Sequence, residues 1–376
     1  MEETFRLGRI AGIPIGVNWS VLVVVWLLAW SLAAGYLPAA EPGYRSGEYW
    51  LVGVAAAVVF LASLLAHEMA HALVAIRGGV GVEGVTLWLF GGVSKLDREA
   101  STPSSELRIA LAGPAVSLGV AAAGGLGAAV LHAAGAPGLA VAALVWLATI
   151  NAVLGIFNLV PAAPLDGGRV LRAVLWQRRG DHLSATLSAS RAGQARGFVL
   201  IALGLLQALL GATLGGLWMV FLGLFLLSAA KAEASHAVLF DALDGVAAGR
   251  IMSSPVVTVA SDTSLQRLVD DVVMVHHCSA FPALDPDGRL VGLVTLRQIR
   301  EVPRSAWPGT TVAQVATPIE QLVLTSPEQP LPELLGRMGT SSDGRALVFD
   351  GESLVGIISP TDIMRTSELA TMAGPR

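Results

Sequence analysis

Long uncharged runs of apolar residues constrain the fold of this chain more than any other feature of its sequence. Four such runs cover residues 19–37, 49–66, 109–131 and 139–160. Each is close to the roughly 20 residues with which a helix crosses the hydrocarbon core of a bilayer. A fifth run, 198–230, is too long for one span, and three glycines near its centre would allow a tight turn, namely Gly211, Gly215 and Gly216. We therefore expect six spanning helices, of which the last two form a hairpin.

The two parts of the chain suit different solvents. Hydrophobic residues make up 54% of the sequence and charged residues only 14%, which is outside the usual range of a soluble protein. Charged residues are sparse before about residue 232 and common after it. We therefore expect a membrane domain at 1–232, a linker at 233–245 and a soluble region from 246 onward. A net charge of -4, without any run rich in Lys and Arg, argues against nucleic acid as a partner.

Basic residues lie mostly on one side of the expected bilayer. The connections on that side hold most of the Lys and Arg of the membrane domain, whereas those on the other side hold only Arg45. Because basic residues near span ends stay in the cytoplasm, this asymmetry places both termini there. Arg196 and Lys231 flank the fifth apolar run, so both of its ends belong on the same side, as six spans require. The sequence thus predicts a multi-pass protein of the cell membrane.

The segment His67-Glu68-Met69-Ala70-His71 follows the second apolar run and has the pattern HExxH. Residues four apart share one face of a helix, so the imidazoles of His67 and His71 could bind one Zn²⁺ per chain. Glu68 beside them could take a proton from water at the metal. The alternative is that these side chains only hydrogen-bond one helix to another. Ionisable groups at membrane depth are costly and usually serve a function, which favours the metal site.

A catalytic zinc usually has three protein ligands, so a third must come from elsewhere in the chain. Asp166 stands out among the few acidic residues of the membrane domain because it follows an apolar segment with Pro161 and Pro164. These prolines should break the helix, and broken backbone at membrane depth is tolerated where it lines a cavity. Asp166-Gly167-Gly168 could equally be an ordinary turn. The residues alone leave both interpretations open.

Together these motifs resemble the site-2 protease family of intramembrane metalloproteases. The resemblance rests on HExxH in the second span and on the run from Asn158 to Asp166, with its pattern Asn-x-x-Pro-x-x-Pro-Leu-Asp-Gly, in the fourth. It covers about residues 1–232. The resemblance implies that zinc is bound by His67, His71 and Asp166, and that Glu68 is the general base.

Two further features follow from the same resemblance. It implies that Asn158 binds the substrate or the oxyanion, for which the alternative is a hydrogen bond between helices. The segment Gly113-Pro114-Ala115-Val116-Ser117 resembles another family motif, in the third span. Its small residues would let helices approach closely, so we expect a role in packing and none in the chemistry.

Residues 82–92 form an apolar run between the second and third spans. The run is rich in β-forming residues and too short to cross a bilayer as a helix, so we expect a strand. By the resemblance, this region lies beside the active site. An edge strand ending at Gly91 and Gly92 could there pair with an unfolded substrate segment. The alternative is a plain interfacial loop.

The soluble region contains an internal repeat. Residues 291–299 recur 64 positions later as 355–363, and an Asp-Gly turn precedes each copy. The expected β-α-β-β-α pattern resembles a tandem pair of CBS domains, which would cover residues 246–303 and 309–367. Such pairs bind adenine nucleotides or serve only to form a homodimer. The sequence leaves both roles open.

The two repeats differ at one position that bears on nucleotide binding. The resemblance places the ribose hydroxyls of an adenine nucleotide against Ser359 and Asp362 of the second repeat. In the first repeat Thr295 is followed by Gln298, which lacks the charge that strengthens such hydrogen bonds. We therefore expect a nucleotide mainly at the second repeat. Asp362 could instead cap the helix that follows it.

The sequence thus predicts an α-helical polytopic membrane protein with an α+β tandem CBS domain. We expect a zinc endopeptidase in the lipid bilayer that cleaves transmembrane segments of substrate proteins, for example anti-sigma factors, and is tuned by the CBS pair. The alternative from another class is a membrane transporter or metal-ion sensor gated by that pair, which would need no general base at Glu68. An inactive scaffold is disfavoured because all four expected catalytic positions are present.

Overall fold

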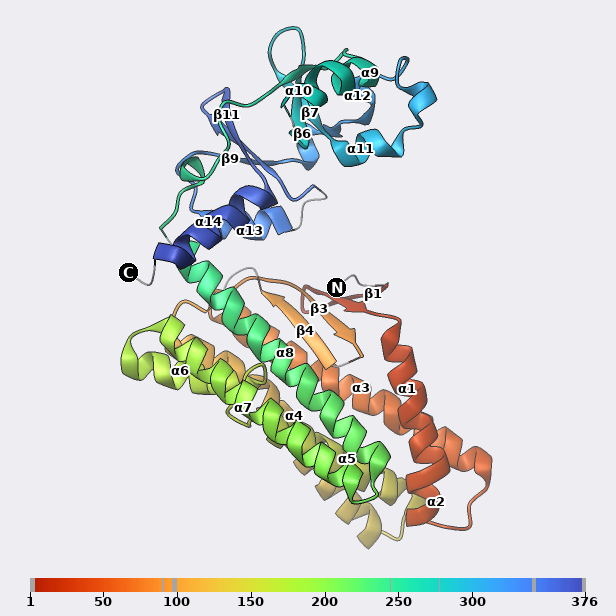
Figure 1. The fold of residues 1–376 in the computed structure, drawn as a ribbon. Coiled ribbons are helices and arrows are strands. Elements are labelled where there is room, and N and C mark those ends of the chain that lie inside the picture. The colour runs from red at the N-terminus through yellow and green to blue at the C-terminus, as the bar shows by residue number, and fades with distance from the viewer. Residues whose placement is uncertain are drawn as a thin grey trace. The chain divides into compact units, whose positions relative to one another are not determined.

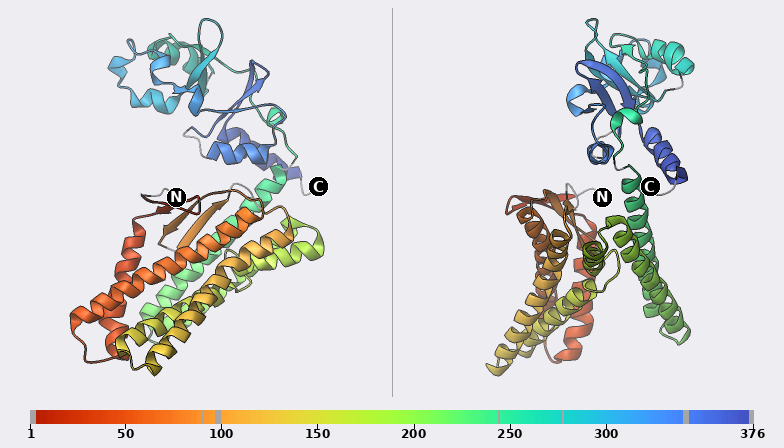
Figure 2. Two further views of the ribbon diagram at one scale, coloured as in Figure 1. Left: turned by 180° about the vertical axis from the view of Figure 1, so that it is seen from behind. Right: turned by 90° about the vertical axis from the view of Figure 1, so that its left-hand side faces the viewer.

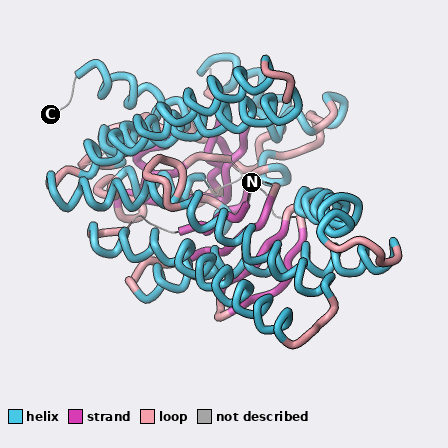
Figure 3. Tube along the Cα trace, turned by 90° about the horizontal axis from the view of Figure 1, so that it is seen from below, coloured by secondary structure: helices cyan, strands magenta, loops and turns pink. Residues whose placement is uncertain are grey.

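The computed structural model describes residues 4–89, 91–96, 100–243, 245–276, 278–339 and 343–373. Phe90, in the run expected to be a strand, lies outside the described residues. The chain divides into two compact units, Met1–Ala237 and Val238–Arg376. Helices dominate the first unit, and the strands of both units are short (Figures 1 and 3).

Six helical segments that begin in the described part of the first unit are long and apolar enough to cross a membrane. They are Ser20–Ala40, which comprises α1 (Ser20–Ser31), a π-helical stretch (Leu32–Tyr36) and α2 (Leu37–Ala40), followed by α3 (Ser46–Arg77), α4 (Pro103–Ala133), α5 (Gly138–Asn158), α7 (His182–Leu209) and α8 (Thr213–Leu243). The remaining helix, α6 (Asp166–Arg179), is shorter and carries several arginines. The prediction of a polytopic helical membrane protein is therefore confirmed.

Helices α7 and α8 form the expected hairpin and lie side by side (Figure 2). Gly211 supplies the turn with a φ of +98°, a conformation that favours glycine. The sequence placed Gly215 and Gly216 in this turn as well, but both lie in α8. A Cβ at Gly216 would lie 2.5 Å from the backbone nitrogen of Ala208 in α7, so the absence of a side chain lets the two helices approach closely.

A four-stranded sheet accompanies the helices of the first unit. Its order is β1 (Phe5–Ile10), β2 (Ile13–Val17), β3 (Val82–Trp88) and β4 (Gly91–Leu96). The expected strand at 82–92 is thus a hairpin, in which Trp88 of β3 pairs with Gly91 of β4. Strands β2 and β3 pair in parallel across a long sequence separation, and the N-terminal strands had no counterpart among our expectations. Strand β4 is the last strand of this sheet as described.

Two sheets form the second unit. The first contains β5 (Val259–Ala260), β6 (Ala280–Leu284), β7 (Leu290–Thr295) and β8 (Thr317–Pro318), and the second contains β9 (Val323–Thr325), β10 (Ala346–Asp350) and β11 (Ser353–Ile358). The described α-helices are α9 (Leu265–Arg267), α10 (Met274–His276), α11 (Leu296–Glu301), α12 (Val312–Val315), α13 (Leu331–Gly339) and α14 (Pro360–Ala373). The antiparallel hairpins β6–β7 and β10–β11 are the two copies of the sequence repeat.

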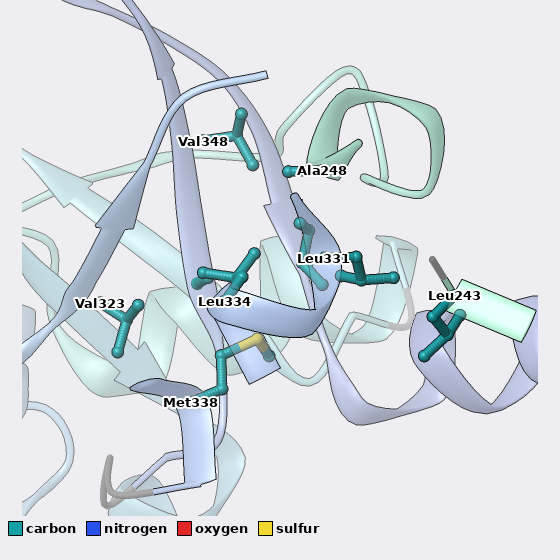
Figure 4. Close-up of a cluster of buried hydrophobic side chains, with 9 residues drawn as sticks. Leu243, Ala248, Val323, Leu331, Leu334, Met338 and Val348 are labelled. Atoms are coloured by element: carbon teal, nitrogen blue, oxygen red, sulfur yellow. The ribbon is translucent and has the colours of Figure 1, made fainter. Parts of the chain in front are cut away.

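The two repeats exchange short segments. Strand β8, from the start of the second repeat, pairs with β7 of the first. Ser253, from the start of the first repeat, forms a bridge with Ile357 of β11. A buried apolar cluster joins α13 to β9, β10 and the end of α8, and includes Leu331, Leu334 and Leu243 (Figure 4). This α+β arrangement agrees with the tandem CBS fold that the repeat predicts.

Candidate metal centre

Helix α3 carries His67 and His71 on one face, as their spacing predicts. Their Nε2 atoms lie 3.2 Å apart. Asp166, the first residue of α6, brings its Oδ2 atom to 3.2 Å from each of these nitrogens. One oxygen and two nitrogens therefore form a nearly equilateral triangle, built from residues up to 99 positions apart in the chain.

The triangle fits a tetrahedral metal ion. Ligands that lie about 2.0–2.1 Å from a tetrahedral zinc are about 3.3 Å from one another, close to the 3.2 Å separations found here. Both imidazoles are buried, with His67 only 3% exposed. Two imidazoles and one carboxylate are a donor set that zinc accepts in catalytic sites. The residues present therefore fit the expected ion.

A metal ligand must be deprotonated, so binding of the ion requires Asp166 as a carboxylate and both imidazoles without a proton on Nε2.

Helix α4 orients both imidazoles through their second nitrogen. The Nδ1 atom of His67 lies 2.8 Å from the hydroxyl of Ser117. The Nδ1–H group of His71 donates to the backbone carbonyl of Ile109 at 2.7 Å. Partners of this kind fix the ring orientation and leave Nε2 available for a metal.

Gly113 lies between these two partners on α4 and faces the site directly. A Cβ atom at this position would overlap with Nε2 of His71, and would lie 2.5 Å from Nε2 of His67. The expected close approach of helices holds at Gly113, whereas the contact of Ser117 with a candidate ligand goes beyond packing and was not predicted. The signal was in the sequence: Ile109, Gly113 and Ser117 are spaced four apart, so they share one face of α4.

Strand β4 lies against Glu68. The hydroxyl of Ser94 donates to Oε2 of Glu68 at 3.3 Å. A Cβ at Gly92 would overlap with Cγ of the same side chain, so glycine allows the strand to approach the carboxylate. Gly91 begins β4 with a φ of +130°, which favours glycine. The run expected beside the active site thus reaches Glu68 at Gly92, and Ser94, two residues beyond the run, adds a contact that was not predicted.

Asn158 ends α5, just before the Pro-containing segment. Its Nδ2 atom donates to the carbonyl of Leu154, one turn earlier in its own helix, at 3.0 Å. The structure thus shows a hydrogen bond within α5, and a role in substrate binding stays a prediction.

The segment after Asn158 is irregular, as Pro161 and Pro164 predicted. Gly168 packs against the backbone of Ala163 so tightly that a Cβ would overlap with it, which fixes where α6 begins.

Ser359 and Asp362, the residues expected to bind a nucleotide, cap the N-terminus of α14. The backbone N–H of Ser359 donates to Oδ2 of Asp362 at 2.8 Å, and the hydroxyl of Ser253 donates to Oδ1 at 3.0 Å. Both carboxylate oxygens therefore have partners within the protein. In the first repeat, Gln298 accepts from the backbone of Thr295 at 2.7 Å and donates to the hydroxyl of Thr317 at 2.7 Å. Nucleotide binding stays a prediction at either position.

Comparisons with known proteins agree with this arrangement. The sequence pattern of peptidase family M50 matches residues 55–134 and 126–204, and that of the CBS domain matches residues 248–305 and 312–368. Rip3 of Mycobacterium tuberculosis, whose name makes it a candidate zinc metalloprotease, is 44% identical over 376 residues, which are 100% of this chain and 95% of that protein. The Synechocystis protein sll0528, named in the same way, is 33% identical over 97% of this chain and 96% of its own.

A solved structure is also similar to part of the chain. The site-2 protease from Methanocaldococcus jannaschii is 27% identical, with a TM-score of 0.41, and the match covers 61% of this chain and 94% of that one.

Proposed function

Since the chain belongs to peptidase family M50 and carries a tandem CBS domain, we propose that it is an intramembrane zinc endopeptidase. Its substrates would be proteins with a membrane-spanning segment. The observation that carries the proposal is the triangle of His67, His71 and Asp166. Glu68 follows His67 directly on helix α3.

Each residue of the centre has a separate task in this proposal. His67, His71 and Asp166 would hold the ion, and Ser117 and Ile109 keep the two imidazoles in the required orientation. A bound zinc supplies Lewis acidity and makes water a nucleophile near neutral pH.

Glu68 is the general base in this proposal. Its carboxylate accepts a proton from the attacking water and passes it to the amine that leaves. The hydroxyl of Ser94 holds this carboxylate from the side of β4. Asn158, at the end of α5, would bind the substrate or the oxyanion through its amide.

Strand β4 offers a way to present the substrate. Peptide bonds within a transmembrane helix are closed to attack because the helix backbone hydrogen-bonds to itself. An unwound substrate segment could pair with the edge of β4 by strand addition, which would place it beside Glu68 through Gly92 and Ser94.

The wider biological setting is part of the same proposal. The protein would be a multi-pass protein of the cell membrane with both termini in the cytoplasm, as the basic residues indicate. Release of regulators such as anti-sigma factors from the membrane is a suitable task for such a protease. The CBS pair would tune it, by binding an adenine nucleotide or by forming a homodimer.

Membrane proteomics of cells that carry wild-type protein or the Glu68→Gln variant tests the proposal. Loss of the general base should lower cleavage by a factor of about 10²–10⁴, while zinc stays bound. Glu83→Gln, which makes the same charge change at an exposed position of β3, should leave cleavage unchanged. Equal fragments in wild type and Glu68→Gln would contradict a protease. Zinc transport that persists in Glu68→Gln would favour a transporter instead.

A further inference from the structure

A buried ion cluster surrounds Arg172 of α6, six residues beyond Asp166. Its centre is Arg172, whose Nε donates to Oε1 of Glu106 at 2.6 Å and whose Nη2 contacts the same oxygen. A second carboxylate, Glu233 of α8, lies 3.4 Å from Nη1. The side chains of Arg172 and Glu106 are only 10% and 2% exposed, whereas that of Glu233 is 27% exposed. The pair of Arg172 and Glu106 is therefore the tight and buried part of the cluster.

This pair joins α6 to α4, two of the three helices that build the metal centre. Asp166 is the first residue of α6, and Arg172 is on the same short helix. Glu106 is in the first turn of α4, three residues before Ile109, so both lie on neighbouring positions of one face. Ile109 and Ser117 of α4 hold the imidazoles of α3. One ion pair thus connects the helix of the carboxylate ligand to the helix that orients both histidines.

Stability alone does not explain the ion pair. Replacing a buried ion pair by well-packed apolar residues is often neutral or stabilising, so apolar side chains could join α6 to α4 equally well. Two guanidinium nitrogens that converge on one carboxylate oxygen add a directional constraint that apolar contacts lack. The benefit of the pair is a fixed register of α6 along α4.

We propose that Arg172 is a positioning residue of the metal centre. Its ion pair with Glu106 holds α6 against α4, and this keeps Oδ2 of Asp166 at the 3.2 Å separation from the Nε2 atoms of His67 and His71. The inference rests on the proposed function, because it takes the triangle to be a zinc site. Glu233 is not required, because its contact with Arg172 is longer and more exposed.

Zinc affinity of the full-length protein in detergent tests the inference, measured by competition with a chelator. Arg172→Gln and Glu106→Gln should each weaken zinc binding by up to about tenfold, the lower end of the effect of removing a group that hydrogen-bonds a ligand directly. Arg172→Lys, which keeps the charge but not the fork, should fall between them and wild type. Glu233→Gln is the matched control and should bind zinc like wild type.

A second readout separates positioning from general stability. The rise in melting temperature on adding zinc to metal-free protein should shrink in Arg172→Gln and Glu106→Gln, because stabilisation by a ligand follows its affinity. If Arg172→Gln does not fold, Glu106→Gln decides, since it keeps the volume and an acceptor at that position. Wild-type zinc affinity in folded Glu106→Gln and Arg172→Lys would overturn the inference. A wild-type protein that binds no zinc would instead overturn the proposed metal site.

Discussion

The Nε2 atom of His71 occupies the space that a Cβ atom at position 113 would need, so only glycine fits beside it. We therefore expect Gly113→Ala to lower zinc affinity about tenfold or more, because the imidazoles must move away from Asp166. Metal content after purification at limiting zinc measures the effect. Gly119→Ala, on the same helix with open space around its Cα, is the control and should keep full metal content. Equal zinc content in both variants would show that a side chain at residue 113 can be accommodated without displacing the imidazoles.

The contact of Ser117 with His67 leads to a second prediction. Ser117→Ala removes the hydroxyl that lies 2.8 Å from Nδ1 of His67 and should weaken zinc binding about 10–100-fold. Ser63→Ala is a suitable control, because Ser63 is also buried but donates to the carbonyl of Phe60 within its own helix. A chelator titration of both variants compares them. If the two bind zinc equally well, the hydroxyl of Ser117 does not orient the ligand.

The expected orientation in the membrane can be tested at two exposed serines. In a Cys278→Ser background, Ser46→Cys at the start of α3 should react with a membrane-impermeant thiol reagent added to intact cells. Ser254→Cys, in the second unit, should react only after the cells are opened. These outcomes follow from the excess of basic residues on one side of the spans. The reverse labelling pattern would contradict cytoplasmic termini.

Nucleotide binding by the CBS pair gives a fourth prediction. Calorimetric titration with AMP, ADP and ATP should show saturable binding that weakens roughly tenfold to hundredfold in Asp362→Ala, because a hydrogen bond to a charged group contributes about 1.5–3 kcal/mol. Gln298→Ala should change it little, because the neutral amide of Gln298 lacks the charge that strengthens a hydrogen bond to a ribose hydroxyl.

Asp362→Asn separates the two roles of this carboxylate. It keeps an acceptor for the N–H of Ser359, and so the helix cap, but removes the charge. Weakened binding in Asp362→Asn supports a ribose site. No heat with any of the three nucleotides would leave dimerisation as the function of the pair.

Local patterns in the sequence predicted those features that depend on residues close together in the chain. The apolar runs predicted the spanning helices, and the spacing of His67 and His71 predicted their common face on α3. Gly211 marked the turn of the last hairpin. The internal repeat predicted the two hairpins of the second unit, because each copy carries its own Asp-Gly turn.

Contacts between distant segments were harder to foresee. Strand β2 pairs with β3, although Ile15 and its partner Val85 are far apart in the sequence, and no local pattern reports such a pairing. Ser117 meets His67 across 50 positions, and Arg172 meets Glu106 across 66. Asp166 was recovered only through a family resemblance, since Asp-Gly-Gly is by itself an ordinary turn.

The position of β4 at the end of its sheet has a consequence for inhibitor design. Within the described residues, β4 pairs with β3 on one side, so the backbone groups of its outer edge can receive another extended chain. A compound with a short peptide backbone and a terminal hydroxamate would be held at two points, along β4 and at the proposed metal. The chelating group would bind many metalloenzymes, whereas the side chains that such a compound presents along β4 would supply the selectivity for this one.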